Sequence, residues 1–474
     1  MSAPLEKLLR DARVDLVLAR IESDPSIIRE VISHLDSEIR SIKFNSINVL
    51  GELGEKSENA IPLLTRCLDD DDWSICREAA RSLGKIGILA KDALPILSNL
   101  LSDKEVSIRK EAAIAIGRIK NPTSESLSAL INALKDSNEE VRTEAANALG
   151  EIGSDAYEAI PELMDSLKDV NWVVRTATAQ AISKIGKNSI KAIPALVNAL
   201  DDDDWRVRYR VVNTLASMGE PAVPALLEIL KMKNIIAIKE AIDCLGEIKI
   251  ADPKIIDKIS DLLTSRSEKV RGKAADALRS IGKETVPVLI KALEKARNNM
   301  KVIIISALGG VGVEANQAIP ILANLLSLPE QEQEYNPSFT NILKRAIIAF
   351  LKDPLGRKAA IRVELARALG KIGSESQDAV VTLGSALNDP KYTVRKEAAL
   401  SLGKLGTFAS SSIPLLVKVL EDRNPDVRWR ASEALGMIGV KKDEVIENLN
   451  NLIHDKCDYV CESAINALDN LTEQ

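Results

Sequence analysis

Arginine and aromatic residues that could bind a ligand are concentrated at two places in this chain. Residues 205–210 read Trp-Arg-Val-Arg-Tyr-Arg, and residues 428–430 read Arg-Trp-Arg. Exposed arginine and aromatic side chains are enriched at the energetic centres of protein interfaces, and guanidinium groups pair well with carboxylates and phosphates. The candidate partner-binding residues are therefore Arg206, Tyr209, Arg210, Trp429 and Arg430.

Acidic and sulfur-containing residues at three places are of the types that bind metal ions. Two acidic runs, Asp69–Asp72 and Asp201–Asp204, each precede a tryptophan, but carboxylates at a helix start are also favoured by capping and by the helix dipole. Cys457 and Cys461 lie one helical turn apart near His454, and nothing completes a set of four zinc ligands. We therefore expect neither a metal ion nor a cofactor.

The sequence contains no motif that indicates a reaction. It lacks the phosphate-binding pattern G-x-x-x-x-G-K-S/T, and no G-x-G-x-x-G occurs between a strand and a helix. General acid–base catalysis by a carboxylate pair stays open, because 69 acidic residues make any choice of a pair arbitrary. The sequence does not decide whether the chain is an enzyme, and it favours a non-catalytic protein.

The elements that carry these residues come from a repeated pattern. Residues 141–153 read V-R-x-x-A-A-x-A-L-G-x-I-G, and most copies follow one another at 33 residues. The position of Leu149 recurs at Leu50, Leu83, Ile116, Ile182, Leu215, Leu245, Leu278, Leu308, Leu369, Leu402, Leu435 and Leu468. A fixed period of this size is the signature of a solenoid. The sequence thus predicts an all-α solenoid of about 13 helical hairpins.

Each repeat is expected to hold a short helix A followed by a longer helix B. In helix B the valine, alanines, leucine and isoleucine recur at helical spacing and form an alanine-rich apolar stripe. We expect Gly150 to permit close helix packing and Gly153 to end the helix. Helix A carries a proline in its first turn, as at Pro161, where the missing N–H costs nothing.

At the start of six helix B segments, an aspartate stands six residues before an arginine. The pairs are Asp103 and Arg109, Asp136 and Arg142, Asp169 and Arg175, Asp202 and Arg208, Asp389 and Arg395, and Asp422 and Arg428. With the helix-A proline, this pattern resembles the HEAT repeat, and the L-G-x-I-G ending resembles the subclass found in phycobilisome lyase-type HEAT-like proteins. The resemblance implies a right-handed α-α superhelix, a structural Asp–Arg ladder between adjacent repeats, and helix B segments along the concave face.

Departures from the pattern predict where the ladder weakens. Cys76, Ile238 and Cys461 occupy the arginine position, and Met232, Ser265, Lys295 and Gly356 occupy the aspartate position. A di-iron hydroxylase resembling deoxyhypusine hydroxylase is excluded on ligand count, because it needs several His-Glu pairs and only His34 and His454 are present.

Four segments are expected along the chain. Residues 1–25 contain an N-terminal cap helix over 4–22, and residues 26–327 hold repeats 1–9 with the first part of an interrupted repeat. Residues 328–355 are an insertion with a predicted helix over 339–351, and residues 356–474 hold the remaining repeats. Insertions in solenoids map to loops and often to binding, so the insertion is a second candidate location for a partner.

Composition narrows the function further. The net charge of −6 disfavours a nucleic-acid or anionic-membrane binder. The sequence contains no unbroken apolar run of about 18 residues, so we expect no membrane-spanning helix. The charged N-terminus does not resemble a signal peptide, and the odd number of cysteines favours a reduced, cytoplasmic chain.

The leading hypothesis is a non-catalytic scaffold or adaptor that binds a protein partner along the concave helix-B face. One alternative, suggested by the resemblance, is a bilin lyase or isomerase, or a chaperone of a chromophore protein. Another alternative is nucleic-acid binding by a basic patch of the concave face. The oligomeric state is left open.

Overall fold

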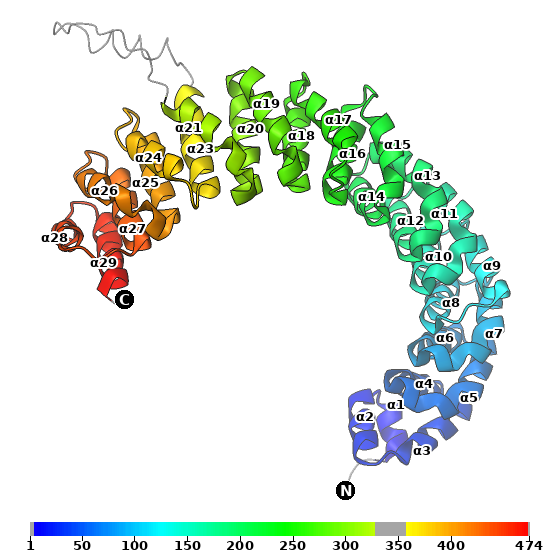
Figure 1. The fold of residues 1–474 in the computed structure, drawn as a ribbon. Helices are drawn as coiled ribbons and strands as arrows, with labels where there is room; N and C mark the ends of the chain where they lie inside the picture. Colours follow the sequence, from blue (N-terminus) through cyan, green and yellow to red (C-terminus); the bar gives the residue numbers. More distant parts are fainter. Residues whose placement is uncertain (1–3, 328–356, 473–474) are drawn as a thin grey trace, which may run out of the picture. The chain divides into compact units, whose positions relative to one another are not determined.

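The computed structural model describes residues 4–327 and 357–472, and these residues form helices and no strand (Figure 1). The predicted α-solenoid is therefore confirmed. The chain divides into two compact units, Met1–Cys244 and Leu245–Gln474, and the division falls inside α16 (Ile235–Ile248). Each unit is a stack of helical hairpins and is described by itself.

In the first unit, short helix A segments and 14-residue helix B segments alternate in two layers (Figure 1). The helix B segments are α4 (Arg40–Leu53), α6 (Trp73–Ile86), α8 (Val106–Ile119), α10 (Glu139–Ile152), α12 (Trp172–Ile185) and α14 (Trp205–Met218). The helix A segments are α3 (Ile27–Ser33), α5 (Ile61–Arg66), α7 (Leu94–Leu100), α9 (Ser124–Ala133), α11 (Ile160–Ser166), α13 (Ile193–Asn198) and α15 (Val223–Ile229).

The second unit repeats the same alternation. Its helix B segments are α18 (Glu268–Ile281), α20 (Asn298–Val311), α23 (Arg357–Ile372), α25 (Tyr392–Lys404), α27 (Pro425–Ile438) and α29 (Asp458–Thr472). Its helix A segments are α17 (Pro253–Asp261), α19 (Val286–Lys295), α21 (Ile319–Ser327), α24 (Gln377–Ala386), α26 (Ile413–Val419) and α28 (Asp443–Leu452). The predicted insertion 328–355 and its helix lie outside the described residues.

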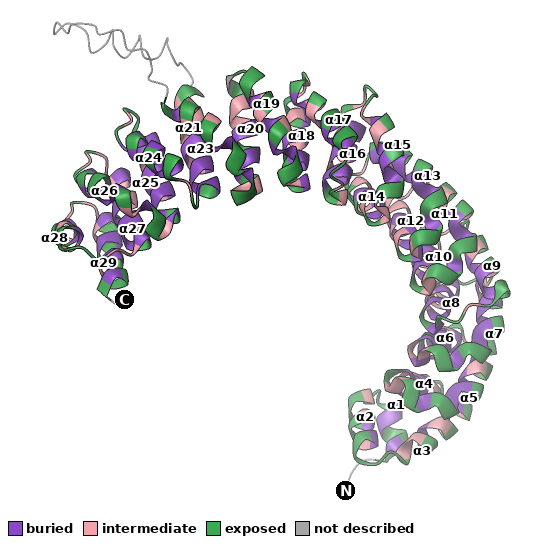
Figure 2. Ribbon diagram, in the orientation of Figure 1, coloured by how far each residue is buried: buried purple, intermediate pink, exposed green. Residues whose placement is uncertain are grey.

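The core of each unit lies between the two layers and between successive helix B segments (Figure 2). In α10 the side chains of Val141, Ala145 and Leu149 are fully buried. A Cβ atom added to Gly150 would lie 2.9 Å from Cα of Ala181 in the next helix B. The backbones therefore meet at this position, as the alanine-rich stripe predicts, and glycine leaves the room that this approach requires.

A left-handed glycine ends most helix B segments and starts the connection to the following helix A. Gly153 ends α10 with φ of +74° and begins a 3-10 segment, Gly153–Ala159. That segment buries Ala156 and leads into α11, where Pro161 lies in the first turn. Both local predictions, the terminal glycine and the helix-A proline, are confirmed here.

The N-terminal cap differs from the single helix expected over residues 4–22. Two helices, α1 (Leu5–Arg10) and α2 (Val14–Ser23), are separated at Ala12, whose φ is +55°. The break lets Leu9 and Val17 both face the first repeat, whereas Leu16 is exposed. The Asn45 side chain donates a hydrogen bond to the Leu9 carbonyl at 2.8 Å. The prediction of one continuous helix was wrong because tertiary contacts redirect the chain.

One stretch, Asn299–Ser327, has the length and apolar composition of a membrane-spanning helix. The structure divides it into α20, a 3-10 segment over Gly312–Ala318, and α21. Gly312, with φ of +78°, ends α20 after 14 residues, whereas a helix that crosses a bilayer needs about 20. Ile304, Ile305 and Leu308 are buried within the repeat, so hairpin packing accounts for the apolar character.

We predict that Gly150→Ala lowers the free energy of unfolding by about 1–3 kcal/mol, because the added methyl group must push α10 away from α12. The matched control is Gly272→Ala in α18, where an added Cβ meets nothing within 4 Å. That change should be neutral or stabilise by up to about 1 kcal/mol, because alanine is the better helix former. Denaturant unfolding followed by circular dichroism measures both, and equal effects would contradict the close-approach interpretation.

Candidate functional site

A ladder of arginine and aspartate side chains links successive repeats. Arg142 donates from Nε and Nη2 to the carboxylate of Asp169 in the next repeat, at 2.7 and 2.9 Å. Its Nη1 donates to the main-chain carbonyl of Asp136 at 2.8 Å. The same forked pair joins Arg109 to Asp136, Arg175 to Asp202, Arg362 to Asp389, Arg395 to Asp422, and Arg428 to Asp455.

These ion pairs run between adjacent repeats, as the resemblance implies, and the structure identifies the carboxylate that each arginine contacts. Within a repeat, the arginine contacts the carbonyl oxygen of the aspartate six residues earlier, as Arg109 does with Asp103 at 2.9 Å. The carboxylate that neutralises Arg109 belongs to Asp136, 27 residues later. Sequence periodicity could have identified this partner, since the 27-residue spacing recurs as regularly as the six-residue spacing.

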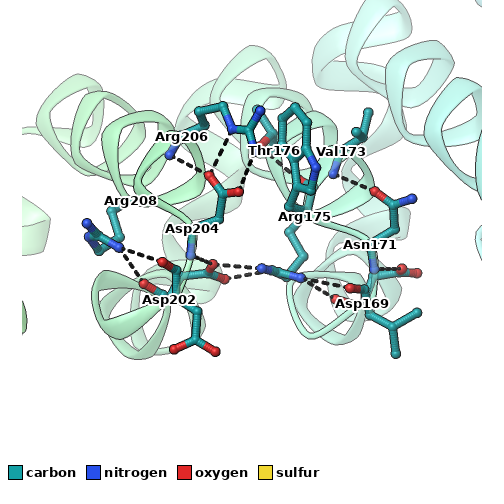
Figure 3. A network of polar contacts seen from close by, with 12 residues as sticks. Asp169, Asn171, Val173, Arg175, Thr176, Asp202, Asp204, Arg206 and Arg208 are labelled. Carbon is teal, nitrogen blue, oxygen red and sulfur yellow. Dashed lines mark hydrogen bonds and ion pairs between the residues drawn. The ribbon is translucent and has the colours of Figure 1, made fainter.

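Each ladder aspartate also shapes the turn before helix B. Asp169 Oδ1 accepts a hydrogen bond from the Asn171 amide at 2.8 Å, and the Asn171 side chain then caps α12. Figure 3 shows this turn and the next, where Asp202 accepts from Arg175 and from the Asp204 amide. One carboxylate thus holds its own turn and the preceding repeat together.

The arginine and aspartate side chains of the ladder are mostly buried, and their pairing keeps them ionised. The side chains of Arg142 and Asp169 are only 13% and 10% exposed. Burial pushes the pKa of the Asp169 carboxyl upward, but the Arg142 guanidinium and the Asn171 amide outweigh it and hold this pKa below its ordinary value. Asp169 therefore stays ionised across the physiological range.

The ladder changes where its residues are replaced. Cys76 and Cys461 donate their thiols to main-chain carbonyls, of Leu68 at 3.0 Å and of Asp455 at 3.1 Å. Arg208, whose expected partner position is Met232, pairs with Glu240 of the following helix B instead, at 3.2 Å. Arg271 Nε is buried without a hydrogen-bond partner among the described residues.

Among the candidate binding residues of the first unit, Arg206 is engaged within the protein. Its Cζ lies 3.3 Å from the centroid of the Trp172 ring, and its Nε and Nη2 donate to Asp204 at 3.0 and 2.6 Å (Figure 3). The Arg206 guanidinium lowers the pKa of the Asp204 carboxyl to about 2. Its charge is therefore largely satisfied before any partner binds.

Tyr209 and Arg210 both lie on α14, but their side chains differ in exposure. Tyr209 is 61% exposed, and Trp205, one turn earlier on α14, is 64% exposed. Arg210 is half-buried, and its Nε has no hydrogen-bond partner among the described residues. The exposed surface of α14 is thus made by Trp205 and Tyr209 more than by its arginines.

Trp429 and Arg430 belong to the second unit and contact their own neighbours. The Trp429 ring meets Tyr459 of α29 edge-to-face, with centroids 5.7 Å apart. Arg430 Cζ lies 3.8 Å from the Trp429 ring centroid, and its Nη1 pairs with Glu433. Trp429 is half-buried by these contacts, so it joins two repeats in addition to offering a surface.

Further ion pairs between successive helix B segments were not anticipated from the sequence. They join Lys85 to Glu52, Lys110 to Glu140, Lys184 to Glu151, Arg367 to Glu397, and Lys396 to Asp426. The charges lie 30 or 33 residues apart, so the repeat period carries the signal. Many mixed-sign charges on helix B are therefore paired across the repeat junctions.

No group of three or more His, Cys, Asp or Glu side chains within the described residues is placed to hold a metal ion. Cys67, Cys76 and Cys244 are buried, whereas Cys457 and Cys461 are half-buried. A surface hollow of about 720 Å³ lies between α7 and α9 and is lined by serine, asparagine and ladder residues, among them Asp103 and Arg109.

The stacked hairpins and the interrepeat ladder define a helical repeat protein of the solenoid class. Eight matches to the family described as HEAT repeats cover residues 6–84, 27–114, 73–130, 94–183, 179–235, 223–299, 346–412 and 405–469. Together they span well over half of the chain, which therefore belongs to the HEAT-repeat family. Among curated protein sequences, none matches this chain.

Solved structures with a similar course include Kap95p, described with RanGDP, and importin beta. Kap95p is 13% identical over 97% of this chain and 73% of its own, with a TM-score of 0.44. Importin beta is 12% identical over 97% of this chain and 81% of its own, with a TM-score of 0.41. An engineered protein is 20% identical over 94% and 98% of the two chains, with a TM-score of 0.32.

We predict that Arg142→Ala lowers the free energy of unfolding by about 1–3 kcal/mol, because it leaves the Asp169 carboxylate and the Asp136 carbonyl without their donor. Thr143→Ala, one residue along, should be nearly silent, since the hydroxyl only bonds the Glu139 carbonyl of its own helix. Denaturant titration of both variants measures the difference. Similar losses at the two positions would show that the arginine is ordinary surface charge.

The lowered pKa of Asp169 predicts a pH-dependent contribution to stability. A carboxyl group whose pKa is depressed by folding stabilises fully above its unfolded value of about 3.9 and loses this contribution as the pH falls through the folded pKa. Asp169→Asn should therefore be less stable than the wild type at pH 7, and the gap should narrow near pH 3. The measurement is the denaturant midpoint of both proteins at each pH, and a constant gap would contradict the assignment.

Proposed function

We propose that the chain is a non-catalytic scaffold that binds a protein partner on its helix-B face. The observation that carries the proposal is the pair Trp205 and Tyr209, which are 64% and 61% exposed one turn apart on α14. Aromatic residues make up only 3% of the chain, and exposed aromatic side chains are typical of interface centres. A solenoid supplies the extended surface that such binding uses.

The ion pairs of the other candidate residues reduce the number of side chains that are available to a partner. Arg206 and Arg430 are held by Asp204 and Glu433, so we assign the energetic centre to Trp205 and Tyr209, with Arg210 beside them. Trp429 is proposed as a second contact point on its own unit.

Two finer proposals accompany this function. We assign the repeats to the phycobilisome lyase-type subclass on the L-G-x-I-G ending, and an absorbance titration with a bilin asks whether chromophore chemistry accompanies the likeness. We also propose a cytoplasmic location, which rests on the cysteine usage.

The test places a photo-crosslinking amino acid at Tyr209 and, as a matched control, at the exposed Asp165 of α11 in the helix-A layer. In cells of the source, position 209 should crosslink to a specific protein and position 165 should not. Trp205→Ala with Tyr209→Ala should then weaken binding of that protein by about 30-fold or more, while the melting temperature is unchanged.

Two outcomes would contradict the placement. A lower melting temperature with undiminished binding would show that Trp205 and Tyr209 are packing elements. Loss of binding only after deletion of residues 330–350 would place the partner site in the predicted insertion.

A further inference from the structure

The junction between α12 and α14 shows how two arginine side chains are held by this repeat. Arg206 lies over the Trp172 ring and pairs with Asp204, while Arg175 forks onto Asp202 at 2.6 and 2.7 Å (Figure 3). One indole and two carboxylates thus receive two guanidinium groups. Stacking of a guanidinium on an indole and its pairing with a carboxylate reinforce each other.

The junction between α6 and α8, three repeats earlier, has a tryptophan and two acidic residues at the same positions. Trp73, Asp103 and Glu105 stand in the positions of Trp172, Asp202 and Asp204. The four helices are of equal length, and Trp73 and Trp172 each open their helix B. The register of this junction therefore matches that of the occupied one.

Both arginines of the occupied junction are missing here. Cys76 stands where Arg175 stands, and Ser107 stands where Arg206 stands. The Cys76 thiol donates to the Leu68 carbonyl, and burial raises its pKa to about 11, with the negative charge of Asp103 adding to the effect. A neutral thiol cannot compensate the charge of the Asp103 carboxylate.

Trp73, Asp103 and Glu105 are therefore accessible to a ligand. Trp73 is 48% exposed. The Asp103 carboxylate accepts a hydrogen bond from the Glu105 amide at 2.7 Å and has no ion pair with any described residue. The Glu105 side chain does not cap α8 and is exposed. The two carboxylates remain without the cations that their counterparts hold, and the Trp73 indole has Arg77 beside it at 5.2 Å.

We propose that Trp73, Asp103 and Glu105 bind a dibasic segment of a protein partner. An arginine of the partner stacks on Trp73 and pairs with Glu105, as Arg206 does with Trp172 and Asp204. A second basic side chain pairs with Asp103 in place of the missing ladder arginine. The inference rests on the proposed scaffold function and adds the chemistry of one partner segment at a surface separate from Tyr209.

The cations of the chain near this junction do not fill the site. Lys104 is exposed and forms no ion pair with a described carboxylate. Arg77, on the same helix as Trp73, makes a looser contact with the ring, because its Cζ lies 5.2 Å from the centroid, compared with 3.3 Å for Arg206 over Trp172. Arg109 is committed to Asp136.

The chain offers a matched control in Trp205. Its indole is exposed like that of Trp73, but the positions that correspond to Asp103 and Glu105 are held by Met232 and Asn234. An arginine attracted by any exposed indole would bind at both tryptophans, whereas the proposed site needs the carboxylates as well.

The experiment measures fluorescence polarisation of fluorescein-labelled peptides in which two arginines are separated by one, two or three glycines. The purified full-length chain should bind at least one of them about tenfold more tightly than the same peptide with citrulline, which keeps the shape and loses the charge. Trp73→Leu and Glu105→Gln should each weaken binding about fivefold, and Trp205→Leu should leave it within twofold.

A second variant tests the site by filling it with arginine side chains of the chain itself. Cys76→Arg with Ser107→Arg should rebuild the occupied junction inside the chain and abolish peptide binding, with the circular dichroism spectrum unchanged. If burying the new arginine at position 76 disrupts folding, Ser107→Arg alone should still block the arginine that stacks on Trp73.

The proposal is overturned if arginine and citrulline peptides bind equally, or if a folded Ser107→Arg chain binds as the wild type does. Equal losses from Trp73→Leu and Trp205→Leu would also overturn it, by showing general attraction to indoles. Because the assay uses the purified chain and no residue near Tyr209 except the control, its failure leaves the crosslinking test of the scaffold function unaffected.

Discussion

Successive helix B segments approach each other until backbone meets backbone, and the remaining interactions depend on that distance. A Cβ atom on Gly117 would lie 2.7 Å from Cα of Ala148, and one on Gly403 would lie 2.8 Å from Cα of Ala434. The same contact joins Gly309 to Ala368 across the predicted insertion, at 3.1 Å. The extra residues therefore leave the stacking of α20 on α23 unchanged. Small residues at these positions let neighbouring helices pack closely over their whole length.

Close stacking brings the start of each helix B within reach of the next turn, and the Arg–Asp rungs use that proximity. The arginine bonds its own turn through a carbonyl and the next turn through a carboxylate, so one side chain aligns two repeats. Removing one partner leaves a poorly solvated polar group, which costs more than the intact pair contributes. Arg208 illustrates the constraint, since with Met232 in the aspartate position it pairs with Glu240 instead.

The repeats differ most at the exposed positions where helix B begins, and the proposed binding residues lie there. The apolar stripe of helix B is nearly constant, because each of its residues packs against two neighbouring repeats. The exposed positions at the start of helix B differ widely, from Trp73 and Trp205 to Glu139 and Pro425. The α12–α14 junction satisfies its tryptophan and carboxylates internally, whereas the α6–α8 junction leaves them open. The same backbone can thus offer neutral and acidic surfaces through a change of two side chains.

The sequence by itself determined the helical repeat, its period, the closing glycine at positions such as Gly153 and the helix-A proline, because each is a local or strictly periodic property. It also indicated the columns of aspartate and arginine. The tertiary structure decided which aspartate carboxylate each arginine contacts, since that partner lies in the next repeat. It likewise decided that the chain breaks at Ala12, that Arg206 is stacked on Trp172, and that Tyr209 is exposed while Arg210 is half-buried. These features depend on contacts between repeats. Neither the helix propensity of a segment nor the spacing of residues within one repeat specifies such contacts.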